Sequence, residues 1–126
     1  MLIGRGKRVF IVLQIPVGAD KAPHSMIRRG FAGVSPKPDI RPLDRAQVDG
    51  LSESINSQLS AIAGRTGATL IDPRKWLCSQ RVCPVTTAGD EPMYRDAAHL
   101  RPGYVRDNIR FLDAIVLSQS VHAARR

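Results

Sequence analysis

The chain has 126 residues, a length that suits one domain with a modest core. Hydrophobic residues make up 43% and charged residues 24%, which argues against a disordered chain, and no apolar run approaches the ~20 residues of a membrane span. The net charge is +8, but the 19 Lys and Arg residues are scattered, with only three Phe, two Tyr and one Trp to stack on bases. We therefore expect no nucleic-acid binding, and the N-terminal residues lack the apolar segment and cleavage site of a secretory signal.

The first predicted element is a strand in KRVFIVLQIP, residues 7–16. Its apolar, β-branched residues run without alternation toward Pro16, a pattern typical of a strand buried on both faces of a parallel sheet. Residues 17–42 follow, rich in Gly and Pro and without a sustained period, so we expect an irregular excursion over the surface. Excursions of this length in compact domains are often functional.

A helix is predicted from Asp44, because apolar residues then recur at three- and four-residue spacing, and Gly64 and Gly67 offer places to end. The apolar stripe consists of Val48, Leu51, Ile55, Leu59 and Ile62. A second strand is predicted in ATLIDP, residues 68–73, so that strand, helix and strand form a βαβ unit with parallel strands. A closing helix is marked by Val105, Ile109, Leu112 and Val116. Two strands are fewer than the roughly four to six of a usual sheet, which predicts that part of the sheet is missing.

Cys78 and Cys83 lie in WLCSQRVCP, with four residues between them. This spacing lets a disulfide close a short loop, which would indicate an oxidising compartment, although two reduced thiols remain an alternative. A structural zinc site would need four ligands, and the three histidines, His24, His99 and His122, stand at spacings that match no common zinc pattern. The disulfide is favoured, and we expect neither a metal nor another cofactor.

Asp96 and His99 stand three residues apart in EPMYRDAAHLRPGY, residues 91–104. They can meet on one face if the segment makes a single helical turn. The carboxylate would then accept a hydrogen bond from one imidazole nitrogen and fix the tautomer, so that the other nitrogen can take a proton from a nucleophile. This arrangement is the base half of a hydrolytic triad. The same spacing also arises as a helix cap with a neighbouring histidine, so the residues alone leave both interpretations open.

The order of these features resembles the C-terminal half of an SGNH/GDSL-family domain, of the type attached to membrane-bound acyltransferases that O-acetylate bacterial surface polysaccharides. The resemblance runs from about residue 7 to residue 117, and residues 118–126 read as a basic tail. Its most specific part is the cysteine pair followed by MYRDAAHL, residues 93–100. It implies an α/β fold, a three-layer flavodoxin-like sandwich with a parallel sheet whose N-terminal half is missing. Residues 1–126 would then form a partial SGNH domain.

Asp96 and His99 match the family's Asp-x-x-His block residue by residue, which implies the orienting acid and the general base of a catalytic triad. Cys78 and Cys83 match as well, which supports the disulfide and implies a location on the periplasmic side of the inner membrane. In the family, the nucleophilic serine stands in a Gly-Asp-Ser motif after the first strand, and no such motif occurs here. Arg101 replaces the hydroxyl residue that would cap the last helix.

Without that serine we expect the chain alone to be at best feebly active, because removing one triad member typically lowers the rate by several orders of magnitude. The resemblance implies as partners a missing N-terminal half or a membrane acyltransferase domain, and acetylated polysaccharide as the substrate class. Transfer to a sugar hydroxyl and transfer to water both stay open. The alternative is a non-catalytic interaction protein that pairs with another chain supplying the missing strands, and a basic nucleic-acid-binding domain ranks behind both.

Overall fold

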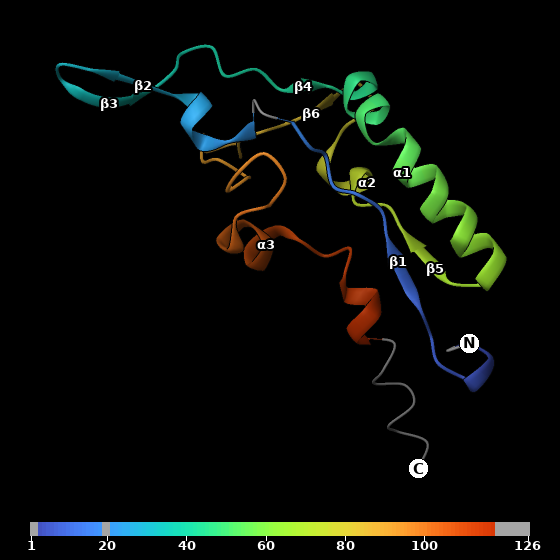
Figure 1. Cartoon of the computed structure of the whole chain (residues 1–126). Coiled ribbons are helices and arrows are strands. Elements are labelled where there is room, and N and C mark those ends of the chain that lie inside the picture. The colour runs from blue at the N-terminus through green and yellow to red at the C-terminus, as the bar shows by residue number, and fades with distance from the viewer. Residues whose placement is uncertain (1–2, 19–20, 118–126) are drawn as a thin grey trace.

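The computed structural model describes residues 3–18 and 21–117, and the strands in them form three two-stranded sheets (Figure 1). The strands are β1 (Phe10–Val12), β2 (Ile27–Gly30), β3 (Gly33–Pro36), β4 (Leu43–Asp44), β5 (Thr69–Ile71) and β6 (Val82–Cys83). The helices are α1 (Arg45–Thr66), α2 (Arg74–Leu77) and α3 (Pro102–Asn108), with 3-10 turns at Ile3–Arg5 and Pro23–Met26. Strands and helices alternate through much of the chain, so the fold is α/β.

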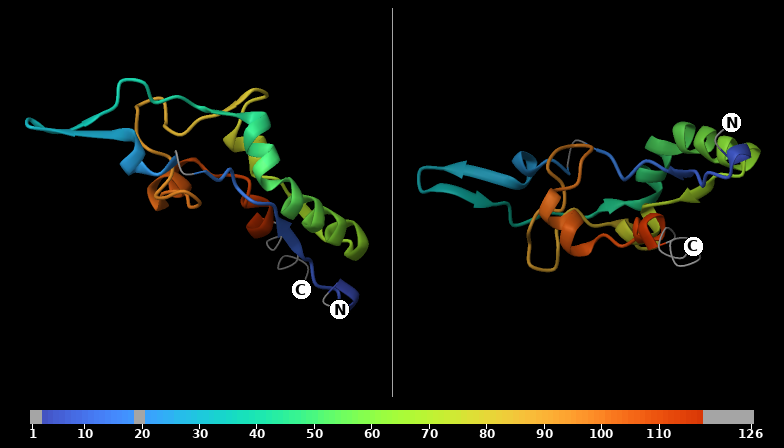
Figure 2. Two further views of the ribbon diagram at one scale, coloured as in Figure 1. Left: turned by 45° about the horizontal axis from the view of Figure 1, so that its top comes forward. Right: turned by 90° about the horizontal axis from the view of Figure 1, so that it is seen from below.

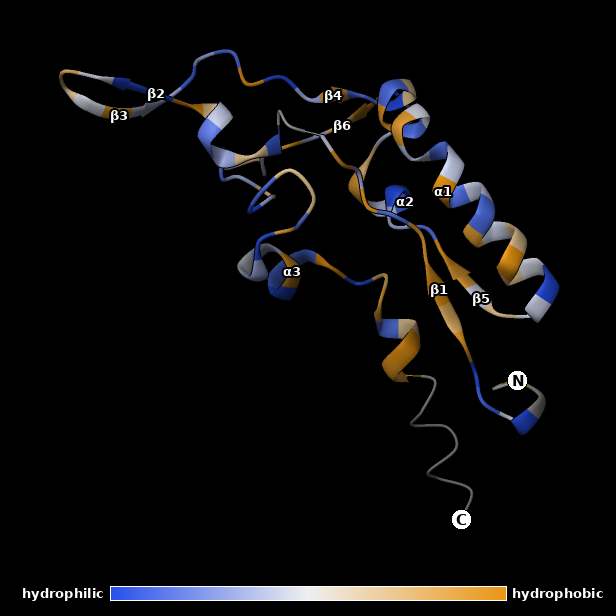
Figure 3. Ribbon diagram, viewed as in Figure 1, coloured by the Kyte–Doolittle hydropathy of each residue, from blue (hydrophilic) through white to orange (hydrophobic). Residues whose placement is uncertain are grey.

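β1 and β5 pair in parallel and are joined by α1, as the predicted βαβ unit requires. Phe10 stands opposite Thr69, and Val12 stands opposite Ile71. β1 is hydrophobic along its length, and β5 is hydrophobic at Leu70 and Ile71 (Figure 3). The other two sheets are antiparallel: β2 pairs with β3, and β4 pairs with β6.

The predicted ends of α1 are confirmed, because both caps are local. Asp44 is the N-cap, and its side chain accepts a hydrogen bond from the backbone N–H of Gln47 at 3.1 Å. Gly67 is the C-cap in a left-handed conformation, with φ 73°, and its N–H donates to the carbonyl of Ala63 at 2.9 Å.

The predicted apolar stripe of α1 is wrong for part of its length. Val48 is 1% exposed, whereas Leu51 is 62% exposed, and Ile55 and Ile62 are exposed as well. The buried residues of the helix are Val48, Ser52, Asn56 and Ala63. This face is used because Asn56 Oδ1 accepts the backbone N–H of Gln14, just beyond β1, at 2.9 Å. A buried polar backbone group needs such a partner, and an apolar stripe offers none.

Two further predictions are corrected in the N-terminal part of the chain. β1 is not buried on both faces, because the side chain of Val12 is exposed. The excursion of residues 17–42 is not irregular throughout, because β2 and β3 form a hairpin within it. A two-residue turn, Phe31 and Ala32, joins them, and Gly33 follows with φ 108°, a conformation that favours glycine. Short strands of exposed residues carry too little hydrophobic pattern to be recognised among glycines and prolines.

The predicted closing helix is broken into two segments. α3 ends at Asn108, Ile109 is extended with φ −87° and ψ 122°, and residues 113–117 are helical again. Ile109 and Phe111 are both buried, which a helix would not allow on one face because residues two apart point in different directions. The extended backbone lets both reach the core. That core contains Ile71, Leu77, Met93, Tyr94, Ile109 and Phe111.

α3 begins at Pro102 even though its N-cap, Arg101, makes no side-chain capping hydrogen bond. Proline suits the first helical position because it has no backbone N–H that would need a hydrogen-bond partner there. Within residues 3–18 and 21–117, no helix combines the length and the hydropathy of a membrane-spanning segment. The predicted basic tail, residues 118–126, lies outside the described residues.

Candidate active site

Asp96 and His99 lie in a turn that is closed by backbone hydrogen bonds. The N–H of Arg95 donates to the carbonyl of His99 at 2.8 Å, and the N–H of Arg101 donates to the carbonyl of Met93 at 2.9 Å. Met93 and Tyr94, at the start of the turn, are buried in the core. The turn is therefore anchored by the packing of Met93 and Tyr94 in the core, while Arg95, Ala98 and His99 are exposed to solvent.

The two candidate catalytic side chains are in direct contact. His99 Nδ1 is 2.8 Å from Asp96 Oδ1 and 3.0 Å from Oδ2. Asp96 Oδ1 also accepts the backbone N–H groups of Ala98 and His99, each at 2.9 Å. The segment is not the helical turn that we expected but a bend closed by the aspartate side chain. The aspartate therefore shapes the loop and holds the imidazole at the same time.

The charge of Asp96 fixes the tautomer of His99. The N–H of Ala98, and then the His99 side chain, lower the pKa of Asp96 to about 2, so the carboxyl group is ionised at neutral pH. An ionised carboxylate can only accept, so Nδ1 donates, and in the tautomer without a proton on Nε2 that nitrogen carries the lone pair. The His99 side chain is 67% exposed, and among the described residues Nε2 has no hydrogen-bond partner. Nε2 is thus open to take a proton from a hydroxyl group.

The loop after β1 is tied to this turn. The N–H of Gly18 donates to the carbonyl of Ala97 at 3.0 Å, between the two candidate residues. The pair therefore lies beyond the carboxyl end of a parallel strand, where α/β folds bind their ligands.

Lys21 is a residue near the site that the sequence did not single out. It is fully buried, and its Nζ lies 5.1 Å from the centre of the Tyr94 ring, with no hydrogen-bond partner in the described chain. Burial lowers the pKa of Lys21 to about 7. The sequence around Lys21 is rich in Gly and Pro and does not indicate that the lysine is buried. Its burial becomes apparent only from the contact with Tyr94 in the structure.

Cys78 and Cys83 form a disulfide in the structure, with an S–S distance of 2.04 Å. Cys83 is buried in β6 and stands opposite Leu43 of β4. Two residues further on, the carbonyl of Val85 accepts the N–H of Met93 at 2.9 Å. The disulfide thus crosslinks β6, and the segment directly after β6 is hydrogen-bonded to the start of the candidate site's turn.

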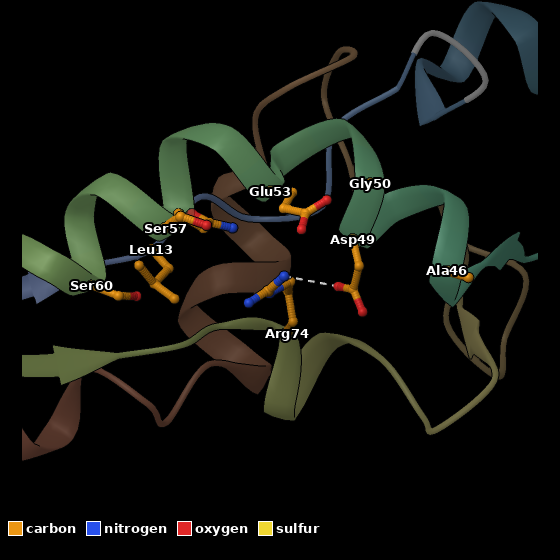
Figure 4. A pocket seen from close by; sticks show the side chains of 9 residues that line it. Leu13, Ala46, Asp49, Gly50, Glu53, Ser57, Ser60 and Arg74 are labelled. Carbon is orange, nitrogen blue, oxygen red and sulfur yellow. Dashed lines mark hydrogen bonds and ion pairs between the residues drawn. The ribbon is translucent and has the colours of Figure 1, made fainter.

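A separate cavity of about 630 Å³ lies between α1 and α2, and no residue of the 93–101 turn lines it (Figure 4). Arg74 reaches across it to Asp49, with Nη1 and Oδ1 2.8 Å apart, and also bonds Asp72 at 2.9 Å. Partial burial raises the pKa of Asp72, but the Arg74 side chain outweighs it and the net shift is downward. These paired charges connect the helix to the loop after β5, which is a structural role. Among the described residues, no three His, Cys, Asp or Glu side chains lie close enough to hold a metal ion.

The comparison with known proteins adds one finding. A family model described as SGNH domain (fused to AT3 domains) matches residues 1–106, a range that includes both Asp96 and His99. No match was found among curated proteins or among solved structures.

Proposed function

Because this chain belongs to the family of SGNH domains that are fused to AT3 domains, its function is associated with acyl transfer, and we propose that Asp96 and His99 are its catalytic acid–base pair. The reaction would be that of an acyltransferase or esterase acting on O-acetyl groups of cell-surface polysaccharide. The observation that supports this most directly is the 2.8 Å contact between His99 Nδ1 and Asp96 Oδ1, with Nε2 left open to solvent.

In the proposed mechanism, His99 Nε2 takes the proton of a serine hydroxyl as its Oγ attacks the acetyl carbonyl carbon. Asp96 holds the ring and stabilises the imidazolium that forms. The protonated Nε2 then gives the proton to the departing oxygen of the donor, which leaves an acetyl-serine. A sugar hydroxyl or water, deprotonated in turn by His99, attacks this ester, and His99 returns the proton to the departing serine Oγ, which regenerates the serine. None of the nine serines in the chain follows Gly-Asp, so the nucleophile is proposed to come from another segment.

The open edge of β1 supports the proposal that further strands complete the sheet. The carbonyl of Val9 and the N–H of Leu13 bond to β5 at 2.8 Å, so the intervening Phe10 and Val12 direct their backbone groups to the opposite edge. Among the described residues, no strand pairs there. Parallel strands share their carboxyl ends, so a serine on the turn after a neighbouring strand would reach the side of the sheet where Asp96 and His99 lie. The three-layer sandwich, with residues 1–126 as part of an SGNH domain, follows as part of the proposal.

The disulfide supports a periplasmic location for the domain. Disulfides persist in oxidising compartments and are rare in the reducing cytosol. Cys78 and Cys83 close a short loop, Cys83 is buried, and Cys78 packs against the core that contains Met93 and Tyr94. We propose that this part of the protein works on the periplasmic side of the inner membrane, next to the acyltransferase domain to which its family is fused.

The proposal is tested in a chimera that carries the N-terminal strands and Gly-Asp-Ser block of another SGNH domain ahead of Lys7. We expect it to hydrolyse 4-nitrophenyl acetate, and we expect His99→Ala to lower kcat/KM by about 10³-fold, because the serine loses its base. His24→Ala is the matched control, since His24 is also exposed and makes none of the described contacts with the turn. Equal rates for the parent chimera and His99→Ala would reject the catalytic role.

A further inference from the structure

The hairpin of β2 and β3 protrudes from one end of the molecule. The views show it extending away from the end of the molecule where β1, β5 and the C-terminal part of α1 lie (Figures 1 and 2). Phe31, in the turn at its tip, is fully exposed, and Val34 is 64% exposed. All residues from 28 to 36 are exposed. The apolar side chains at the tip therefore contribute nothing to the core, and folding leaves them in water.

The same hairpin is strongly basic. Arg28 and Arg29 lie in β2 and Lys37 directly follows β3, while residues 21–38 contain no Asp or Glu. No ion pair to these three residues occurs in the described part of the chain. Their charges are therefore not neutralised by a described ion pair, and the acidic residue nearest to them in the sequence is Asp39, two positions after Lys37.

The strand register arranges these groups in order of distance from the tip. Phe31 is in the turn, Val34 pairs with Arg29, and Arg28 pairs with Ser35 one position further back. Directly paired residues share a face of a hairpin and adjacent residues alternate, so the two arginines flank the tip on opposite faces. An apolar tip with cations behind it matches the depth profile of a bilayer surface, where apolar groups enter and basic groups remain at the headgroups.

We infer that this hairpin is a membrane-surface anchor, in which Phe31 and Val34 enter a bilayer containing anionic lipids and Arg28, Arg29 and Lys37 contact its headgroups. The inference does not depend on the proposed catalytic function. Each basic residue near an anionic surface strengthens binding about fivefold, so the anchor is weak and reversible, and it would orient the domain at the surface.

Other occupants fit the hairpin less well. A stable protein interface buries roughly 800 Å² on each partner, more than two apolar side chains can offer. A sugar or other small molecule is normally held in a concave site. The hollow of about 300 Å³ beside the hairpin is lined by residues 28–35 alone, so no second element supplies an opposing wall. A polyanion would use the cations but would have no need of the apolar tip.

The test is co-sedimentation of the full 126-residue chain with vesicles, in 0.1 M NaCl, of phosphatidylcholine alone or with 30% phosphatidylglycerol. We expect binding to the anionic vesicles and at least about tenfold weaker binding to the neutral ones. The double variant R28Q/R29Q should weaken binding by about 20-fold, and Phe31→Ser by about fivefold without any change in charge. The control R5Q/K7Q removes the same charge from exposed residues at the other end of the molecule and should change binding by less than about threefold.

A fluorescence measurement separates insertion from simple adsorption. Phe31→Trp in a Trp76→Phe background should show a blue shift of its emission when anionic vesicles are added, and quenching by brominated lipid. No blue shift, or equal effects of R28Q/R29Q and R5Q/K7Q, would overturn the inference. A second outcome would also overturn it: Phe31→Ser binds anionic vesicles as tightly as the parent chain does, and both proteins bind dextran sulfate as tightly as they bind the vesicles. The site would then be one for polyanions. All variants are compared by circular dichroism, and the exposed positions should leave the fold unchanged.

Discussion

The ammonium group of Lys21 lies under the turn that carries Asp96 and His99, packed against the Tyr94 ring. A charged lysine without a hydrogen-bond partner is unfavourable in such a place, because burial removes its hydration. Its pKa of about 7 means that a change of pH near neutrality changes the charge directly beneath the candidate site. The charge of Asp96, by contrast, stays fixed down to a pH of about 2.

We therefore predict that the free energy of unfolding rises between pH 7 and about pH 10. In this range Lys21 stays protonated in the unfolded chain, where its pKa is 10.5, but is neutral in the folded chain. The unfolded state then binds more protons, so raising the pH favours the folded state by a total on the order of a few kcal/mol. Above about pH 10 the trend should reverse, because burial raises the pKa of Tyr94 and the unfolded tyrosine ionises first.

Urea unfolding at pH 6, 7.5 and 9 measures this dependence. Lys21→Met keeps most of the length of the side chain and removes the charge, so it should flatten the pH profile and stabilise the protein at pH 7. A profile as steep in Lys21→Met as in the parent chain would show that another group is responsible.

Some features of the secondary-structure elements can be predicted from the sequence, and others cannot. The ends of α1 are predictable because Asp44 and Gly67 act on their own helix turns. The buried face of α1 is not, because it is chosen by a distant need, the hydrogen bond from Gln14 N to Asn56. The prediction of one continuous closing helix is wrong for the same reason, a distant contact. Phe111 must reach the core, where its ring contacts the Trp76 ring with centroids 5.5 Å apart.

The candidate site divides in the same way. The contact between Asp96 and His99 is predictable from the sequence, because three residues separate them and the aspartate side chain itself closes the bend. The burial of Lys21 depends on where Tyr94 packs, and the link from Gly18 to Ala97 joins segments far apart in the chain. Such contacts come from tertiary packing and leave no local pattern in the sequence.

The two faces of α1 give a prediction at the level of the element. Val48→Ala should lower the free energy of unfolding by about 2 kcal/mol, because it removes buried methyl groups and leaves a cavity. Leu51→Ala, a larger truncation three residues along the same helix, should change it by less than about 0.5 kcal/mol, because Leu51 is exposed. Urea unfolding of both variants is the measurement. A larger loss for Leu51→Ala would mean that the predicted apolar stripe, and not the observed face, packs against the protein in solution.

At the scale of the whole molecule, the open edge of β1 is the feature that the proposed function depends on. A free strand edge with unpaired N–H and C=O groups is a ready template for another strand. The exposed hydrophobic side chains of α1 lie on the same βαβ unit, so the unit leaves both polar and apolar groups that further structure could cover. A completed sheet would satisfy these groups and would bring a serine loop to the side where Asp96 and His99 lie.

Amide hydrogen exchange tests this edge with neighbouring residues of one strand. In the chain alone, at a concentration where sedimentation shows a monomer, the Val12 amide should exchange at least about tenfold faster than the Leu13 amide, which donates to Ile71 at 2.8 Å. In the chimera that supplies further strands, the Val12 amide should become protected while Leu13 changes little. Equal protection of both amides in the monomer would mean that the edge is already covered, and the segment carrying the nucleophile would then need another place to join.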